Sequence, residues 1–107
     1  MTVNIYGRYF LAEGVFSGVA RKGAAVWLIA DSDAGNITYT VQVSFFPYKD
    51  PEDFGISYDA CFSEVLYAAK GRRSKKREES LLADLQTHAD ALAAANGAKI
   101  FWEKPLL

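Results

Sequence analysis

The chain has 107 residues, of which 50% are apolar and 23% are charged, with 12 Lys and Arg against 13 Asp and Glu. This balance excludes a disordered or fibrous chain, because such chains are poor in apolar residues or strictly repetitive. At this length, about 65% of the surface of the unfolded chain can be buried, which is enough for one hydrophobic core. We therefore expect a single compact domain over residues 1–107.

Several absences bear on where the protein acts and on what it can bind. The N-terminal residues form no basic and apolar leader with a cleavage site, and the longest apolar run, Ala24–Ala30, is far shorter than the roughly 20 residues of a membrane-spanning helix. The single cysteine, Cys61, cannot form an internal disulfide. One Cys and one His also leave too few ligands for a zinc site. We expect a cytoplasmic protein without membrane contact, metal or cofactor.

Four strands are expected in the first half of the chain. Ile37–Phe46 alternates between apolar and polar residues, which is typical of an antiparallel strand with one buried and one solvated face. Ala24–Ala30 is apolar at every position, so both sides of this strand are expected to be covered, as in a central strand. The turn-forming residues 31–36 join the two strands as a hairpin. Val3–Leu11 and Glu13–Ala20 are predicted as two further strands, bent at glycines.

The second half of the chain changes to helical spacing. Residues 57–70 repeat apolar side chains at helical intervals behind Ser57, a suitable N-cap, although a period of two also fits the start of this segment. Residues 74–96 are rich in Ala, Leu, Glu and Lys and end before Gly97, which predicts a second helix. A short strand over Lys99–Glu103 is expected to return to the sheet.

Together these elements predict an α+β domain in the order β-β-β-β-α-α-β. The first four strands form an antiparallel meander, two helices follow, and a short C-terminal strand completes the sheet. Because the clean alternation leaves one apolar sheet face, we expect the helices to pack on that face.

The most unusual segment, Lys70–Arg77, holds six of the 12 basic residues and is called the basic segment below. Residues 1–69 carry four basic and eight acidic residues, a net charge of −4, whereas residues 70–107 carry eight and five, a net charge of +3. Clustered cations can contact phosphates and release counterions. Some of these cations would also lie in the first turn of the second helix, where positive charge is unfavourable. The candidate binding residues are Lys70, Arg72, Arg73, Lys75, Lys76 and Arg77.

Three interpretations of the basic segment stay open. A charged turn between two helices is usually only solvated, but it can also bind a nucleic acid or another anion, or form a charged protein interface. Folding of the segment against the acidic residues Asp50, Glu52 and Asp53 would favour the protein interface. No nucleic-acid-binding motif accompanies the segment, and the overall net charge of −1 argues against a general DNA-binding protein.

Aromatic residues form the second candidate site. On the first strand Tyr6, Arg8 and Phe10 occupy alternate positions and so point to the same side of the sheet. If Tyr9, on the opposite side, faces the core, these three residues lie on the outer sheet face. Aromatic rings with an interleaved arginine can stack single-stranded bases or anchor a protein partner. The alternative is packing within the domain, because aromatic residues are good strand formers.

Catalytic candidates are few. His88 lies on the apolar stripe of the second predicted helix, where a histidine is usually a packed residue, and Cys61, in an apolar stretch, is expected to be buried. Nothing in the sequence orients the imidazole toward the thiol, as nucleophilic catalysis requires. We therefore expect a non-enzymatic interaction module that binds a protein partner or a second copy. Nucleic-acid binding is the alternative, and an enzyme that uses Cys61 and His88 is the third hypothesis.

Overall fold

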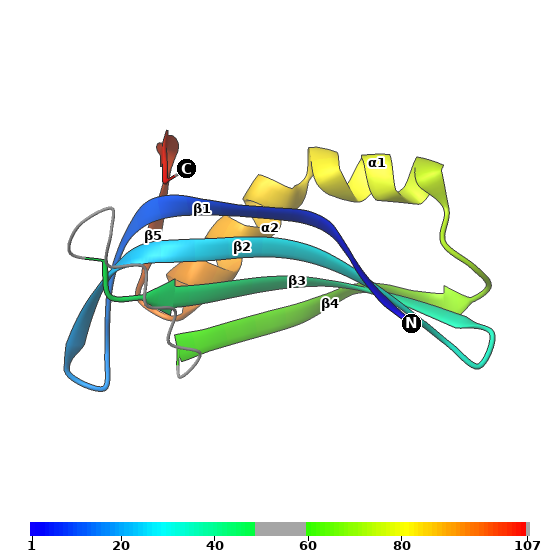
Figure 1. Ribbon diagram of the computed structural model, residues 1–107, viewed down its shortest axis with the longest axis horizontal. Coiled ribbons are helices and arrows are strands. Elements are labelled where there is room, and N and C mark those ends of the chain that lie inside the picture. Colours follow the sequence, from blue (N-terminus) through cyan, green and yellow to red (C-terminus); the bar gives the residue numbers. More distant parts are fainter. Residues whose placement is uncertain (49–59, 107) are drawn as a thin grey trace.

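The computed structural model describes residues 1–48 and 60–106, which form an antiparallel sheet with two helices on one face (Figure 1). The elements are β1 (Thr2–Phe16), β2 (Val19–Asp33), β3 (Asn36–Phe46), β4 (Cys61–Lys70), α1 (Lys75–Ala83), α2 (Leu85–Ala95) and β5 (Lys99–Pro105). The strand order is β4-β3-β2-β1-β5, and every neighbouring pair is antiparallel. The predicted α+β class is confirmed, with its four-strand meander, two helices and C-terminal strand.

The break expected between Val3–Leu11 and Glu13–Ala20 is wrong, because residues 3–16 form one strand, and Val19 and Ala20 already belong to β2. β1 runs to Phe16, and the chain reverses at Ser17 and Gly18, whose φ angles are 52° and 73°. Positive φ at both central residues is typical of a type I′ turn, whose twist matches that of the flanking strands. The predicted break is instead a register shift between Leu11 and Gly14 within β1. The glycine signal therefore marks a bulge and not the end of a strand.

The hairpin predicted at residues 31–36 is confirmed. β2 and β3 pair without a register shift up to a tight turn at Ala34 and Gly35, whose φ angles are 51° and 78°. β2 lies in the middle of the sheet, between β1 and β3. This central position explains why Ala24–Ala30, which lies within β2, is apolar in both phases.

The helix expected over residues 57–70 is wrong for the residues that the structure describes, because Cys61–Lys70 form the edge strand β4. Ser57, the expected N-cap, lies outside the described residues. In the pairing of β4 with β3, Leu66 is an extra residue, which makes a bulge and changes the phase of the strand. The partly buried positions consequently follow a helix-like spacing at Phe62, Leu66, Tyr67 and Ala69.

The helix expected over residues 74–96 is divided in two at Asp84, which has φ −101° and ψ 3° and caps both α1 and α2. Its predicted ends are correct. Ser74 is the N-cap of α1, and Gly97 follows α2 with a φ of 72°. Neither helix in the described part of the chain is long and apolar enough to cross a membrane.

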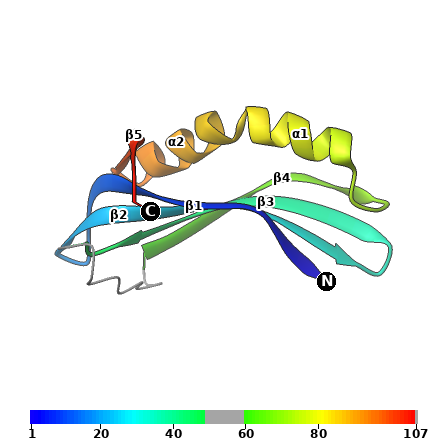
Figure 2. The ribbon, with the colours of Figure 1, turned by 45° about the horizontal axis from the view of Figure 1, so that its top comes forward.

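The main core lies between the helices and the sheet, which arches beneath them (Figure 2). The predicted buried phase of β3 is confirmed, because its five residues are each at most 3% exposed: Ile37, Tyr39, Val41, Val43 and Phe45. Leu85, Ala89 and Ala93 of α2 are buried in the same core. The opposite side of the sheet is called the open face below. A smaller cluster around Ala25 and Phe46 covers one end of it.

Candidate functional site

The basic segment joins β4 to α1, so the prediction that it is a turn between two helices is wrong. It lies at one end of the molecule beside the β2–β3 hairpin (Figure 1), and the N–H of Gly71 donates to the carbonyl of Gly35 at 2.8 Å. Gly71 has a φ of 128°, a conformation that favours glycine. The Oγ of Ser74 accepts a hydrogen bond from the N–H of Arg77 at 3.2 Å and caps α1.

Arg73, Glu78 and Tyr39 form a hydrogen-bonded network that anchors the basic segment to β3. Glu78 is only 8% exposed, and the Nε and Nη2 atoms of Arg73 donate to its two carboxylate oxygens at 3.0 and 2.8 Å. The Tyr39 hydroxyl donates to Glu78 at 2.7 Å and accepts from the N–H of Ser74 at 3.1 Å. The hydrogen bonds from Arg73 hold the pKa of Glu78 below its ordinary value, although burial opposes this shift. The carboxylate is therefore charged and paired within the protein.

The six candidate cations of the basic segment divide into two groups. Arg73 is bound by Glu78, and the Arg77 guanidinium lies 4.0 Å from the centre of the Tyr67 ring in a cation–π contact. The other four are exposed, and their side chains make no ion pair or hydrogen bond with any residue that the structure describes: Lys70, Arg72, Lys75 and Lys76. We call these four residues the free cations.

The acidic residues Asp50, Glu52 and Asp53 lie outside the described residues, so the contact that would favour the protein-interaction hypothesis is not tested by the structure. α1 begins at Lys75, and Lys75 and Lys76 lie in its first turn as expected. There they oppose the helix dipole.

Tyr6, Arg8 and Phe10 lie on the helix-covered face of β1, so the prediction that they lie on the outer face is wrong. Phe10 is 5% exposed and packs on Trp102 with ring centres 4.7 Å apart, while the Arg8 guanidinium lies 5.9 Å from the centre of the Tyr6 ring. The cause is a register shift just before Tyr6, after which Ile5 and Tyr6 both pack against the main core. Tyr6 and Phe10 therefore serve packing, whereas the Arg8 side chain is exposed on the same face.

A different set of aromatic residues lies on the open face. Tyr9 meets Trp27 and Phe46 edge-on, with ring centres 6.3 and 6.2 Å apart. Glycines on neighbouring strands leave room for these rings, because a Cβ on Gly7 would lie 2.7 Å from the Trp27 ring and a Cβ on Gly23 would lie 2.4 Å from the Phe46 ring. Glycine within a strand is the sequence signal that could have revealed this packing.

Two rows of residues without charge cross the open face, and one of them shares Trp27 with this cluster. Their members are paired neighbours on β1, β2, β3 and β4. Val65, on the edge strand, is 57% exposed, and no helix or strand of the described chain lies over the rows (Figure 2). We call them the neutral rows, which are Asn4, Ile29, Thr40 and Val65, and Gly7, Trp27, Gln42 and Ser63.

Cys61 and His88 do not come together. Cys61 pairs with Ser44 on the open face and is exposed, so the expectation that it is buried is wrong; its place at the start of an edge strand explains the exposure. His88 is half-buried on α2, on the other side of the sheet. The sheet separates the thiol from the imidazole, so they do not form a nucleophile and base pair. Nor do three His, Cys, Asp or Glu residues gather as metal ligands anywhere in residues 1–48 and 60–106.

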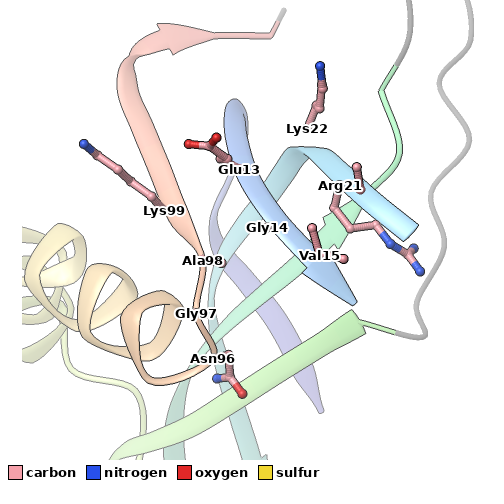
Figure 3. A pocket seen from close by; sticks show the side chains of 10 residues that line it. Glu13, Gly14, Val15, Arg21, Lys22, Asn96, Gly97, Ala98 and Lys99 are labelled. Atoms are coloured by element: carbon pink, nitrogen blue, oxygen red, sulfur yellow. The ribbon is translucent and has the colours of Figure 1, made fainter. Parts of the chain in front are cut away.

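A pocket of about 530 Å³ lies between the bulged end of β1 and the turn from α2 to β5 (Figure 3). Charged residues at its rim include Glu13, Arg21, Lys22 and Lys99. Figure 3 shows the three basic side chains pointing in different directions and not toward a common point. A bound substrate needs converging polar groups, and this arrangement does not provide them.

Comparison with protein-family models, with curated proteins and with solved structures finds no match. The functional argument therefore rests on this chain's own surfaces. The two that stand out are the neutral rows on the open face and the free cations at one end of the molecule.

Proposed function

We propose that this protein is a non-enzymatic interaction module that binds a protein partner through the neutral rows. The observation that carries the proposal is the exposed Val65, 57% accessible, in a sheet surface that four strands build without a charged side chain. The centres of protein interfaces are depleted of charge, whereas a surface for nucleic acid requires cations. The chemistry of the rows therefore favours a protein partner with a flat, uncharged surface.

The neutral rows combine an apolar anchor with uncharged hydrogen-bonding groups. Trp27 is half-buried and rests over Gly7, so little side-chain freedom remains to be lost on binding. Tryptophan is also one of the residues that contribute most at interfaces. Charge begins at the border of the rows, where Asp31 lies 3.7 Å from the amino group of Met1. An uncharged centre with a polar border is the usual composition of a protein interface.

The non-enzymatic role is supported by the separation of Cys61 from His88 and by the divergent side chains of the pocket in Figure 3. We also propose a cytoplasmic location. Cys61 is the only cysteine of the chain, and its exposed thiol suits a reducing compartment.

The variant Val65→Lys tests the proposed function. It places a charge in the neutral rows, and burial of an unpaired charge should weaken a complex there by roughly tenfold or more. The wild type and the variant are compared by capture from native lysate and by size-exclusion chromatography with light scattering. We expect the wild type to retain a protein partner or a second copy and Val65→Lys to lose it.

The matched control is Val15→Lys, because Val15 is also a strand valine, is 67% exposed and lies outside the rows. This variant should retain the partner. Equal capture by wild type and Val65→Lys would locate the contact elsewhere. A lone monomer without any partner in both assays would contradict the proposed function.

A further inference from the structure

The basic segment presents its four free cations from a fixed backbone. The bond from Gly71 to Gly35 holds one side of Arg72, and the bond from the N–H of Ser74 to the hydroxyl of Tyr39 holds the other. Arg73 adds two hydrogen bonds to Glu78 within the same stretch. Because the backbone is already ordered, less conformational entropy is lost when the exposed side chains bind a ligand.

The positive charge of the free cations is only partly offset by their described neighbours. The carboxylate of Glu78 is bound by Arg73, and that of Asp31 lies 3.7 Å from the amino group of Met1. Glu79 lies one helical turn after Lys75, but no ion pair joins the two. Asp33 of the β2–β3 hairpin lines a pocket with Arg72 and Arg73 and also lowers the local charge, but the six cations of the basic segment still outnumber the carboxylates of Asp33, Glu78 and Glu79.

We infer that the free cations bind the phosphate backbone of a nucleic acid. The four side chains come from the end of β4, the connection and the first turn of α1, so they are spread along a surface that suits a chain of phosphates better than one small anion. A broad apolar surface for lipid is absent from α1, because Leu81 packs into the main core and only Leu82, which is 37% exposed, remains as a large apolar side chain at the surface of this helix. This surface is separate from the neutral rows, and the inference does not depend on the proposed function.

The binding should not depend on base sequence. Tyr67 is the aromatic residue beside the segment, and the guanidinium of Arg77 covers its ring at 4.0 Å, so the ring does not offer a free stacking surface. Contacts to phosphate position a nucleic acid without reading its bases. The net charge of −1 on the whole chain should keep the affinity low.

Salt dependence is the quantitative signature of these contacts. If four phosphates are neutralised, the logarithm of the binding constant should fall against the logarithm of salt concentration with a slope of about −2.8 for a single strand and about −3.6 for a duplex. An increase from 50 to 200 mM salt should then weaken single-strand binding about 50-fold.

The experiment measures fluorescence anisotropy of a labelled single-stranded oligonucleotide with the full chain over this range of salt. The test variant combines four substitutions: Lys70→Gln, Arg72→Gln, Lys75→Gln and Lys76→Gln. The control variant removes four cations outside the basic segment: Arg8→Gln, Lys22→Gln, Lys99→Gln and Lys104→Gln. Each variant changes the net charge from −1 by four units to −5, so the two differ only in where charge is lost.

We expect the test variant to bind at least tenfold more weakly at 50 mM salt, with a slope near zero, and the control variant to keep most of the wild-type slope. Equal losses in both variants would show that only net charge matters and would overturn the assignment. So would an unchanged slope in the test variant, or absence of wild-type binding at 50 mM salt. Binding to phosphatidylserine vesicles that needs the same four residues, without oligonucleotide binding, would assign the surface to lipid instead. A cooperative urea transition in all three proteins would confirm that the folds are intact.

Discussion

At the scale of single residues, Tyr39 joins the sheet to the basic segment. The alternation of β3 predicts that Tyr39 is buried, and it is fully buried. The alternation does not predict that its hydroxyl meets Glu78, which lies 39 residues further along the chain. For the same reason the sequence identifies the basic segment but does not separate Arg73 and Arg77 from the free cations. That division depends on the burial of Glu78 beside Tyr39, where it binds Arg73, and on the contact of Arg77 with the Tyr67 ring of β4, and both depend on the folded sheet.

Protonation of Glu78 in acid should measurably lower the free energy of unfolding. Its folded pKa lies below the ordinary value of 4.5 because Arg73 donates hydrogen bonds to the carboxylate. A carboxylate whose pKa is lowered by folding stabilises the folded state. For Glu78 this stabilisation is fully present above pH 4.5 and is lost as the pH falls through the pKa of the folded state. We expect the urea midpoint of the wild type to fall more steeply below pH 4.5 than that of Glu78→Gln, which is already less stable at pH 7.

The control for this experiment is Glu79→Gln, which alters an exposed neighbour on the same helix. Its pH profile should follow that of the wild type. Parallel profiles for Glu78→Gln and the wild type would show that the pair with Arg73 does not contribute to the pH dependence.

At the scale of elements, the sequence predicts regular segments well and bulged strands poorly. β3 and the hairpin at Ala34 follow from a clean period of two and from turn residues. β1 and β4 each contain a register shift, and an extra residue such as Leu66 turns two consecutive side chains toward the same side. Because of this change of phase, simple alternation predicts Phe10 on the outer face, although it lies in the core. The same effect gives the sequence of β4 the spacing of a helix. Single-sequence periodicity does not locate such insertions, because they are defined by the partner strand.

The turn between β2 and β3 offers a stabilising substitution. Ala34 has a φ of 51° and precedes Gly35 at 78°, the conformation in which Asn-Gly is preferred and other L-residues are strained. We expect Ala34→Asn to raise the free energy of unfolding by about 1 kcal/mol and Ala34→Val to lower it, as measured by urea denaturation. Equal stability of the two variants would contradict this account of the turn.

At the scale of the whole molecule, the neutral rows and the free cations occupy different places. The molecule is 42 Å long, the basic segment lies at one end, and Val65 is five residues from Lys70, or roughly 17 Å along β4. Effects at such distances are usually independent. We expect the salt dependence of oligonucleotide binding by Val65→Lys to equal that of the wild type. We also expect the variant that lacks the four free cations to capture the same protein partner as the wild type. Loss of both activities in either variant would indicate one shared surface.

The pairing of β1 with β5 has a consequence for the order of folding during translation. β1 precedes the other elements along the chain, but the strand that pairs with Phe10–Glu13 on its outer edge, Lys99–Pro105, is made only after the other six elements. Until then the nascent chain carries an uncovered strand edge at β1 in addition to the one at β4. Uncovered edges are the places where incomplete chains pair with one another. The pairing of β5 with Phe10–Glu13 therefore removes part of an exposed strand edge as well as completing the sheet.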